Sequence, residues 1–431
     1  MTLSRIEIAG ILRKSTRVAL ATFVTLVGFA ANAQMPTTPQ VMPEPNAPIS
    51  AERLRAHSLF RSLTGTLVPI DDPRLKEMEA FLVSGQDREA AKVATRDPNF
   101  YDIRVRDLAR KMSARDESVR TPLNDFVATF VGVVRDSDTT SGKELLTGNF
   151  TYRADATKTL VNGVQQVRST ELADLVQSNN HYADLQTRGF SLYSVLTKVP
   201  GQKINVNGAA TDIPDAAGLL TTRQWMLAHA DAGTNRRLVE YSFKEFMCQP
   251  MTSWADATAP DDRVARDVSR TPAGSNEKYL TTCKACHGQM DGLRGAFARV
   301  DFVNNQVTYN AGAIPLNGKM NRNQQEFPAG YVTTDATWVN YATVGKNADQ
   351  FGWRSSATGT GMGAFGAMIA NSQGFSRCMV RRIFSDVCKR EPAATEEKMI
   401  RSVADQFESS GYHMRGLFEV VALRPECGVN Q

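Results

Sequence analysis

The chain has 431 residues, of which 50 are basic and 45 acidic, so its formal net charge is only +5. This small excess of positive charge is shared along the chain, which argues against nucleic-acid binding and weakly for an acidic redox partner. The length allows two or three domains with sizeable cores. Beyond the N-terminus, no stretch is long and apolar enough to cross a membrane.

The first 33 residues have the features of a secretory signal peptide. Basic side chains precede an apolar run over 18–30, and Ala31, Asn32 and Ala33 then form a small-x-small cleavage site. The apolar run is too short to span a bilayer comfortably. Gln34 stands where a lipoprotein would need cysteine. We therefore expect a periplasmic or otherwise exported protein, cleaved near Ala33, with no permanent membrane anchor.

Residues 34–50 form a proline-rich linker, and a mainly helical N-terminal domain is expected over 51–215. Apolar residues at helical spacing predict helices from Ala51 to a stop at Gly65 and from Pro73 to a stop at Gly85. Two more helices are predicted over 101–112 and 121–134. Residues 216–310, predicted as the next region, begin with helical patterns over 218–230 and 238–247.

This second region contains Cys283-Lys284-Ala285-Cys286-His287, the Cys-x-x-Cys-His spacing that attaches a c-type haem. A thioredoxin-like redox pair would need a strand before it in a βαβ unit, and none is predicted. A zinc site would need further ligands at short spacing, and the next cysteine is Cys378. A structural disulfide across two intervening residues would be strained. The motif therefore predicts one covalently attached haem c, bound through Cys283 and Cys286, in residues 216–310.

His287 would bind the iron through Nε2, and its Nδ1–H would need a carbonyl partner to fix the tautomer. A methionine on the other side of the iron would favour electron transfer, whereas an open position would permit ligand binding or peroxide chemistry. Met320, Met362 in a glycine-rich and flexible stretch, and His229 are the candidate distal ligands, and the sequence does not choose among them or exclude an open face. Arg294 and Arg299 are candidate partners of the haem propionates, although both could also be solvated helix charges.

The last region, 311–431, is predicted as a loop-rich segment followed by a C-terminal helical domain. Residues 301–360 are rich in asparagine, glycine and threonine, which predicts loops and short strands. Helices are predicted over 375–388 and 396–409, with Thr395 as N-cap of the second and a stop at Gly411. The predicted fold class is thus mainly α, with an embedded cytochrome c-like haem region and loop or short-strand insertions.

Four cysteines remain outside the motif, namely Cys248, Cys378, Cys388 and Cys427. An even remainder in an exported protein predicts one or two disulfides. If all four are used, three pairings are possible, and the sequence does not choose among them.

Several segments around the motif resemble the planctomycete-type cytochrome c-like domain family, which is exported and of largely unassigned function. The resemblance is carried by residues 218–230, 236–237, 248–250, 283–292, 297–301, 375–378, 390–392, 411–412 and 417–418, and more weakly by 61–65, 81–82 and 145–149. It implies a largely helical protein built around one c-type haem. Gly292 stands where the family usually has proline, which bears on the loop geometry near the haem.

Three functions follow from these patterns. The first is an exported mono-haem c-type cytochrome that transfers electrons to a redox partner protein or respiratory complex. The second is a haem-dependent oxidoreductase with an open distal face, and the third is a haem-carrying subunit of a larger complex. Hydrolase and nucleic-acid-binding motifs are missing from the sequence. Whether the protein is an enzyme stays open at this point, with electron transfer favoured.

Overall fold

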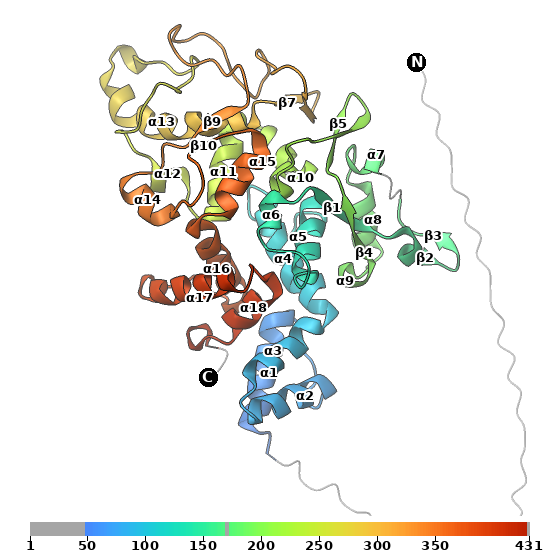
Figure 1. Cartoon of the computed structure of the whole chain (residues 1–431). Helices are drawn as coiled ribbons and strands as arrows, with labels where there is room; N and C mark the ends of the chain where they lie inside the picture. The colour runs from blue at the N-terminus through green and yellow to red at the C-terminus, as the bar shows by residue number, and fades with distance from the viewer. Residues whose placement is uncertain (1–47, 169–171, 429–431) are drawn as a thin grey trace, which may run out of the picture. The chain divides into compact units, whose positions relative to one another are not determined.

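The computed structural model describes residues 48–168 and 172–428, so the predicted signal peptide and most of the proline-rich linker lie outside the described residues. From Ile49 onward the chain forms one compact unit. As predicted, this unit is mainly helical (Figure 1). Its main hydrophobic core extends from Ala56 to Cys427. The domain boundaries predicted at residues 215 and 310 stay predictions.

The N-terminal helices begin and end where local sequence chemistry requires. Ser50 and Asp72 accept hydrogen bonds from the first-turn amides of α1 and α2, and Gly65 ends α1 with a φ of 78°. Phe126 through Val134 are all buried, which places α5 in the core. The elements are α1 (Ala51–Thr64), α2 (Pro73–Val83), α3 (Asp87–Arg96), a π-helical turn (Phe100–Val105), α4 (Arg106–Met112), α5 (Asp125–Arg135) and α6 (Glu144–Thr147).

The strands of the described residues pair as five antiparallel two-stranded sheets. The pairs are β1 (Phe150–Ala154) with β4 (Leu196–Pro200), β2 (Leu160–Val161) with β3 (Val164–Gln165), β5 (Lys203–Val206) with β6 (Ala209–Asp212), β7 (Val300–Val303) with β8 (Gln306–Tyr309), and β9 (Thr337–Val339) with β10 (Thr358–Thr360). The last two sheets confirm the short strands predicted over 301–360. Between β1 and β4 the register places Tyr152 opposite Lys198.

Helix α11 lies at the centre of the second half of the chain. It packs against α10, α13 and α16 (Figure 1). The helices between residues 172 and 293 are α7 (Leu172–Leu175), α8 (Asn180–Thr187), α9 (Leu192–Val195), α10 (Arg223–Ala230), α11 (Asn235–Met247), α12 (Met251–Trp254) and α13 (Lys284–Leu293). A 3-10 turn (Gly218–Thr221) precedes α10, and a π-helical turn (Tyr279–Cys283) leads directly into α13.

The C-terminal helices pack back onto the N-terminal ones, since α18 contacts both α1 and α3. They are α14 (Gly345–Phe351), α15 (Gly361–Ala370), α16 (Gln373–Cys388), α17 (Glu397–Ser409) and α18 (Met414–Ala422). Two predictions need correction. Thr395 does not cap α17, because it lies inside a 3-10 turn (Ala394–Glu396) that precedes this helix. The glycine-rich stretch around Met362 is not a flexible loop but the buried start of α15.

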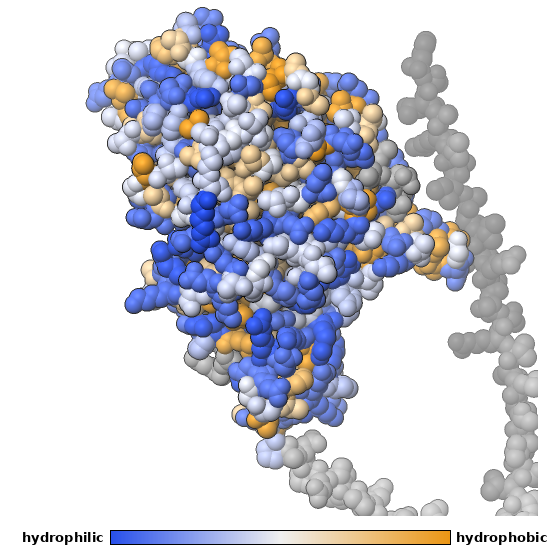
Figure 2. Space-filling model, viewed as in Figure 1, coloured by the Kyte–Doolittle hydropathy of each residue, from blue (hydrophilic) through white to orange (hydrophobic). Residues whose placement is uncertain are grey.

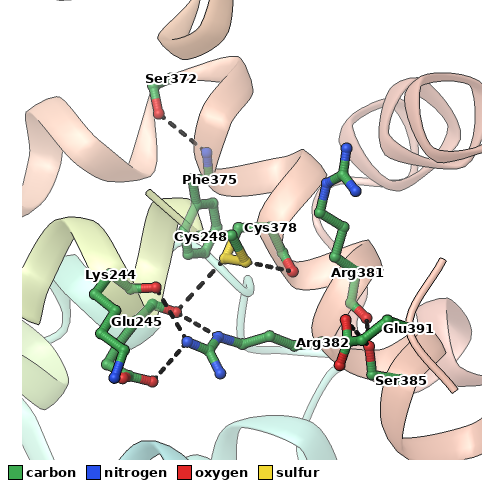
Figure 3. The surroundings of a disulfide bond; sticks show 10 residues. All are labelled: Lys244, Glu245, Cys248, Ser372, Phe375, Cys378, Arg381, Arg382, Ser385 and Glu391. Carbon is green, nitrogen blue, oxygen red and sulfur yellow. Dashed lines mark hydrogen bonds and ion pairs between the residues drawn. A yellow bond between two sulfur atoms is a disulfide. The ribbon is translucent and has the colours of Figure 1, made fainter. Parts of the chain in front are cut away.

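The four cysteines outside the motif form two disulfides, as predicted. Cys248 pairs with Cys378, and Cys388 pairs with Cys427. The first bond joins the C-terminal end of α11 to α16, and Figure 3 shows Arg382 beside it, donating hydrogen bonds to the carbonyl oxygens of Glu245 at 2.7 Å and Lys244 at 3.1 Å. Two disulfides indicate that the chain folds in an oxidising compartment.

The surface is mainly polar. Figure 2 shows apolar side chains as small scattered patches on the visible face. One of these patches is the β2–β3 hairpin, where Leu160, Val161 and Val164 are exposed. Among the helices of the described ranges, none is both long and apolar enough to span a bilayer.

Candidate functional site

The predicted motif lies at a junction between two helical segments. Cys283 is the last residue of the π-helical turn, and Cys286 and His287 belong to the first turn of α13. Three residues of helix place the two thiols about one turn apart on the same side. This is the arrangement that the sequence predicted for the three residues.

Both thiols of the motif are free, whereas the other four cysteines are paired. Both are half-buried, but in different surroundings. Cys286 packs against the main core, and Cys283 packs against a small second cluster made of Val264, Val268 and Tyr279. Burial raises the pKa of the Cys286 thiol, so this side chain is a neutral thiol in the free protein.

His287 is held through one ring nitrogen. Its Nδ1 lies 3.3 Å from Oδ1 of Asp291, one turn further along α13. The sequence predicted a carbonyl partner at this position, and the structure supplies a carboxylate instead, because the i,i+4 spacing brings both side chains to one face of the helix. Within the described residues Nε2 has no hydrogen-bond partner, and 26% of the side chain is exposed.

Asp291 is a buried carboxylate with every oxygen occupied. The backbone N–H of Ala265 donates to Oδ2 at 2.9 Å, and Arg236 of α11 donates through Nε to Oδ1 at 2.5 Å and through Nη2 to Oδ2 at 2.9 Å. Burial alone would raise the pKa of Asp291, but Arg236 and His287 hold this pKa well below its usual range. Asp291 is therefore ionised where it meets His287.

Arg236 continues this network to a second carboxylate. Its Nη1 and Nη2 donate to the two oxygens of Asp267 at 2.8 and 2.7 Å. Sequence reasoning did not assign a role to Arg236, Asp267 or Asp291. Helical spacing could have linked Asp291 to His287, but nothing in the sequence pairs the loop residue Asp267 with α11.

Arg294 lies seven residues after His287, and its side chain is completely buried. None of its three guanidinium nitrogens has a hydrogen-bond partner in the described part of the chain, and the nearest carboxylate oxygen, from Asp267, is 3.9 Å from Nη1. Burial and then Arg236 lower the pKa of Arg294 to about 10. Arg299 differs, because its Nη1 donates to the carbonyl oxygens of residues 310, 311 and 312. Of the two predicted propionate partners, Arg294 is the one whose guanidinium nitrogens are all buried without a hydrogen-bond partner among the described residues.

The three candidate distal ligands are all buried. Met320 lies in a loop and its carbonyl accepts from Asn235 at 3.1 Å, whereas Met362 is in the first turn of α15. The ring of His229 in α10 lies 4.2 Å from that of Trp225 and 4.1 Å from that of Tyr241, centroid to centroid. No hydrogen bond or ring contact of the described residues joins any of the three to His287.

Two further features bear on the motif. A Cβ on Gly292 would lie 2.6 Å from the carbonyl oxygen of Val339, so glycine at this position lets β9 approach α13 closely. In the described ranges, no three His, Cys, Asp or Glu side chains converge as metal ligands.

Compared with models of known protein families, with curated proteins and with solved structures, the chain matches none of them. The resemblance described from the sequence therefore stays a hypothesis.

Proposed function

We propose that this chain is an exported mono-haem c-type cytochrome that transfers electrons. The observation that carries the proposal is the state of His287, which is fixed through Nδ1, has no partner for Nε2 among the described residues, and follows two free thiols in the chain. Thioethers would form when the Sγ–H groups of Cys283 and Cys286 add across the two vinyl groups of one porphyrin. The haem would supply a one-electron couple at its iron.

The residues around the motif fit a haem. A haem carries two propionate carboxylates, and a buried guanidinium whose donors are unused is costly unless an anion reaches it. Arg294 is such a guanidinium, and it lies seven residues beyond His287, where α13 ends and a 3-10 turn (Arg294–Phe297) begins. Cys283 and Cys286 would hold the porphyrin edge, His287 the iron, and Arg294 a propionate. On this proposal, residues 216–310 contain the cytochrome c-like region.

The two disulfides support export, because such bonds persist in oxidising compartments. The proposed haem attachment would also take place outside the cytoplasm. We propose that the N-terminal 33 residues direct this export and that a redox partner protein or respiratory complex receives the electrons. The resemblance of several segments to planctomycete-type cytochrome c-like proteins agrees with the proposal.

The size of the chain favours a second candidate function. If none of Met320, Met362 and His229 binds the iron, the iron would be open to small ligands and the protein would be a haem-dependent oxidoreductase. With 431 residues, the chain is far larger than a simple carrier needs.

Spectroscopy of protein exported into a bacterial periplasm with haem-attachment machinery tests both proposals. The wild type should retain haem after denaturation, and Cys283→Ser with Cys286→Ser should abolish this covalent haem. Thr282→Ser, at an exposed position in the π-helical turn that contains Cys283, is the control and should retain the covalent haem. A wild type without covalent haem would overturn the proposal.

The same preparation separates the two functions. A low-spin spectrum that carbon monoxide does not change supports the electron carrier. A reduced spectrum that shifts with carbon monoxide supports the open iron and the oxidoreductase.

A further inference from the structure

We infer that Asp291 is a positioning residue that, together with Arg236, sets the reduction potential of the haem by polarising His287. The inference rests on the proposed haem and concerns the side of His287 that faces away from the iron. It follows from the difference between the neutral carbonyl expected at Nδ1 and the carboxylate found there.

A carboxylate partner changes the ligand as well as its orientation. A hydrogen bond from Nδ1–H to an ionised acceptor is stronger than one to a carbonyl, and it makes the other ring nitrogen a more basic ligand. A more basic imidazole stabilises ferric iron over ferrous iron. Asp291 should therefore lower the midpoint potential relative to a neutral partner.

The carboxylate cannot turn away from His287. Asp291 is 1% exposed, and the backbone N–H of Ala265 and two nitrogens of Arg236 hold its oxygens from other directions. A surface carboxylate at the same sequence spacing would spend much of its time in solvent. Here the contact with His287 is part of the packed interior.

Arg236 opposes the effect of Asp291. Its guanidinium donates to both carboxylates, Asp291 and Asp267, and so withdraws negative charge from the oxygen that faces His287. A substitution that weakens this guanidinium should leave more charge on Asp291 and lower the potential further. The two residues of the pair thus have predicted effects of opposite sign.

The test is the midpoint potential of the full-length haem-loaded protein, measured by spectroelectrochemistry. Asp291→Asn, which keeps the size of the side chain but removes the charge, should shift the ratio of reduced to oxidised protein about tenfold toward reduced at a fixed potential, or 59 mV for a one-electron couple. Asp291→Glu should restore most of the wild-type value. Arg236→Gln should shift the potential downward.

Asp267→Asn is the matched control, because it removes a carboxylate of the same network that does not contact His287. Its shift should be clearly smaller than that of Asp291→Asn. Equal shifts in these two variants would overturn the inference and leave only a general effect of buried charge. An unchanged potential in Asp291→Asn would overturn it as well.

Wild-type protein provides a measurement that requires no stable variant. In the oxidised protein the Nδ1 proton of His287 should give a paramagnetically shifted proton resonance that exchanges slowly with deuterated water, because Asp291 accepts it from the interior. A rapidly exchanging proton would overturn the inference. Failure of the proposed function gives a different result, namely a wild type without covalent haem, which overturns both.

Discussion

Cys248 and Cys378 are bonded to each other across 130 residues of sequence, so the end of α11 is fixed to α16 (Figure 3). Helix α11 also provides Arg236, which holds the Asp291 carboxylate beside His287. The disulfide therefore fixes the end of the helix that provides Arg236 to the candidate site.

Removing this disulfide should lower the free energy of unfolding. The paired substitution Cys248→Ala with Cys378→Ala opens a long loop and is expected to cost about 3–4 kcal/mol, chiefly through the entropy of the unfolded chain. The change would be measured by denaturant unfolding. The pair Cys388→Ala with Cys427→Ala is the control, because it opens a loop of only 39 residues. A larger loss in this control than in the first pair would contradict the loop-entropy explanation.

Arg294 should affect the free and haem-loaded proteins differently. In protein expressed without haem attachment, Arg294→Met removes a buried cation that has no hydrogen-bond partner among the described residues, and should raise the stability by about 1–3 kcal/mol. In haem-loaded protein the same substitution leaves a propionate unpaired and should cost about 1–3 kcal/mol. Thermal or denaturant unfolding of both forms gives the comparison.

Arg299→Met provides the control for Arg294→Met. The guanidinium of Arg299 donates to backbone carbonyl oxygens of a loop, so its loss should destabilise both forms alike. An equal effect of Arg294→Met on both forms would show that Arg294 has no role toward a haem.

Much of the helical framework could be predicted, because its ends are set locally. Ser50 and Gly65 delimit α1 as caps do in any protein, and the helix predicted over 375–388 coincides with α16 apart from its first two residues. By contrast, α15 contains three glycines and was not predicted as a helix, and its start around Met362 was predicted to be flexible. A Cβ on Gly366 would overlap the carbonyl oxygen of Leu146, so the glycine there serves the close packing of α15 on α6. Such a reason exists only in the folded chain.

The candidate site, too, could be predicted from the sequence only in part. The motif residues and their helical placement follow from spacing alone, and so could the contact between His287 and Asp291. The ion pairs of Arg236 with Asp267 and Asp291 join α11, a loop and α13, which are 31 and 55 residues apart in sequence. No local pattern predicts them, because they depend on how α11 packs against α13.

Glu245 should make stability depend on pH near neutrality. Burial raises the pKa of Glu245 to about 7, even though Arg382 lies 2.6 Å away. When the pKa of an acidic group is higher in the folded than in the unfolded state, protonation favours the folded state. The protein therefore becomes more stable as the pH falls from above 7 toward 4.5. As the pH falls through this window, the free energy of unfolding of the wild type should therefore rise relative to that of Glu245→Gln, by about 1 kcal/mol per pH unit. Unfolding free energies at pH 8, 7, 6 and 5 test this.

Glu277→Gln is the control for Glu245→Gln, since Glu277 is an exposed carboxylate that does not act on Glu245. Its stability should follow that of the wild type at every pH. If the free energy of unfolding of Glu245→Gln shows the same pH dependence as that of the wild type, the Glu245 carboxylate is ionised throughout the range. Arg382 then compensates fully for its burial.

His229 should behave as a neutral core residue rather than a haem ligand. Burial lowers the pKa of His229 to about 3, so only the unfolded chain takes up a proton as the pH falls below about 6.5. The free energy of unfolding of the wild type therefore falls in this pH range, and His229→Phe should remove this loss. Relative to the wild type, the variant should be more stable by about 1 kcal/mol for each pH unit from 6 to 4. The measurement is again the unfolding free energy, now accompanied by the visible spectrum of the haem-loaded variant. The spectrum should not change, because the His229 ring is buried in the core, where it packs against Trp225 and Tyr241. A change from low-spin to high-spin haem in His229→Phe would instead identify His229 as the sixth ligand, and it would require α10 to move toward α13 when the haem is attached.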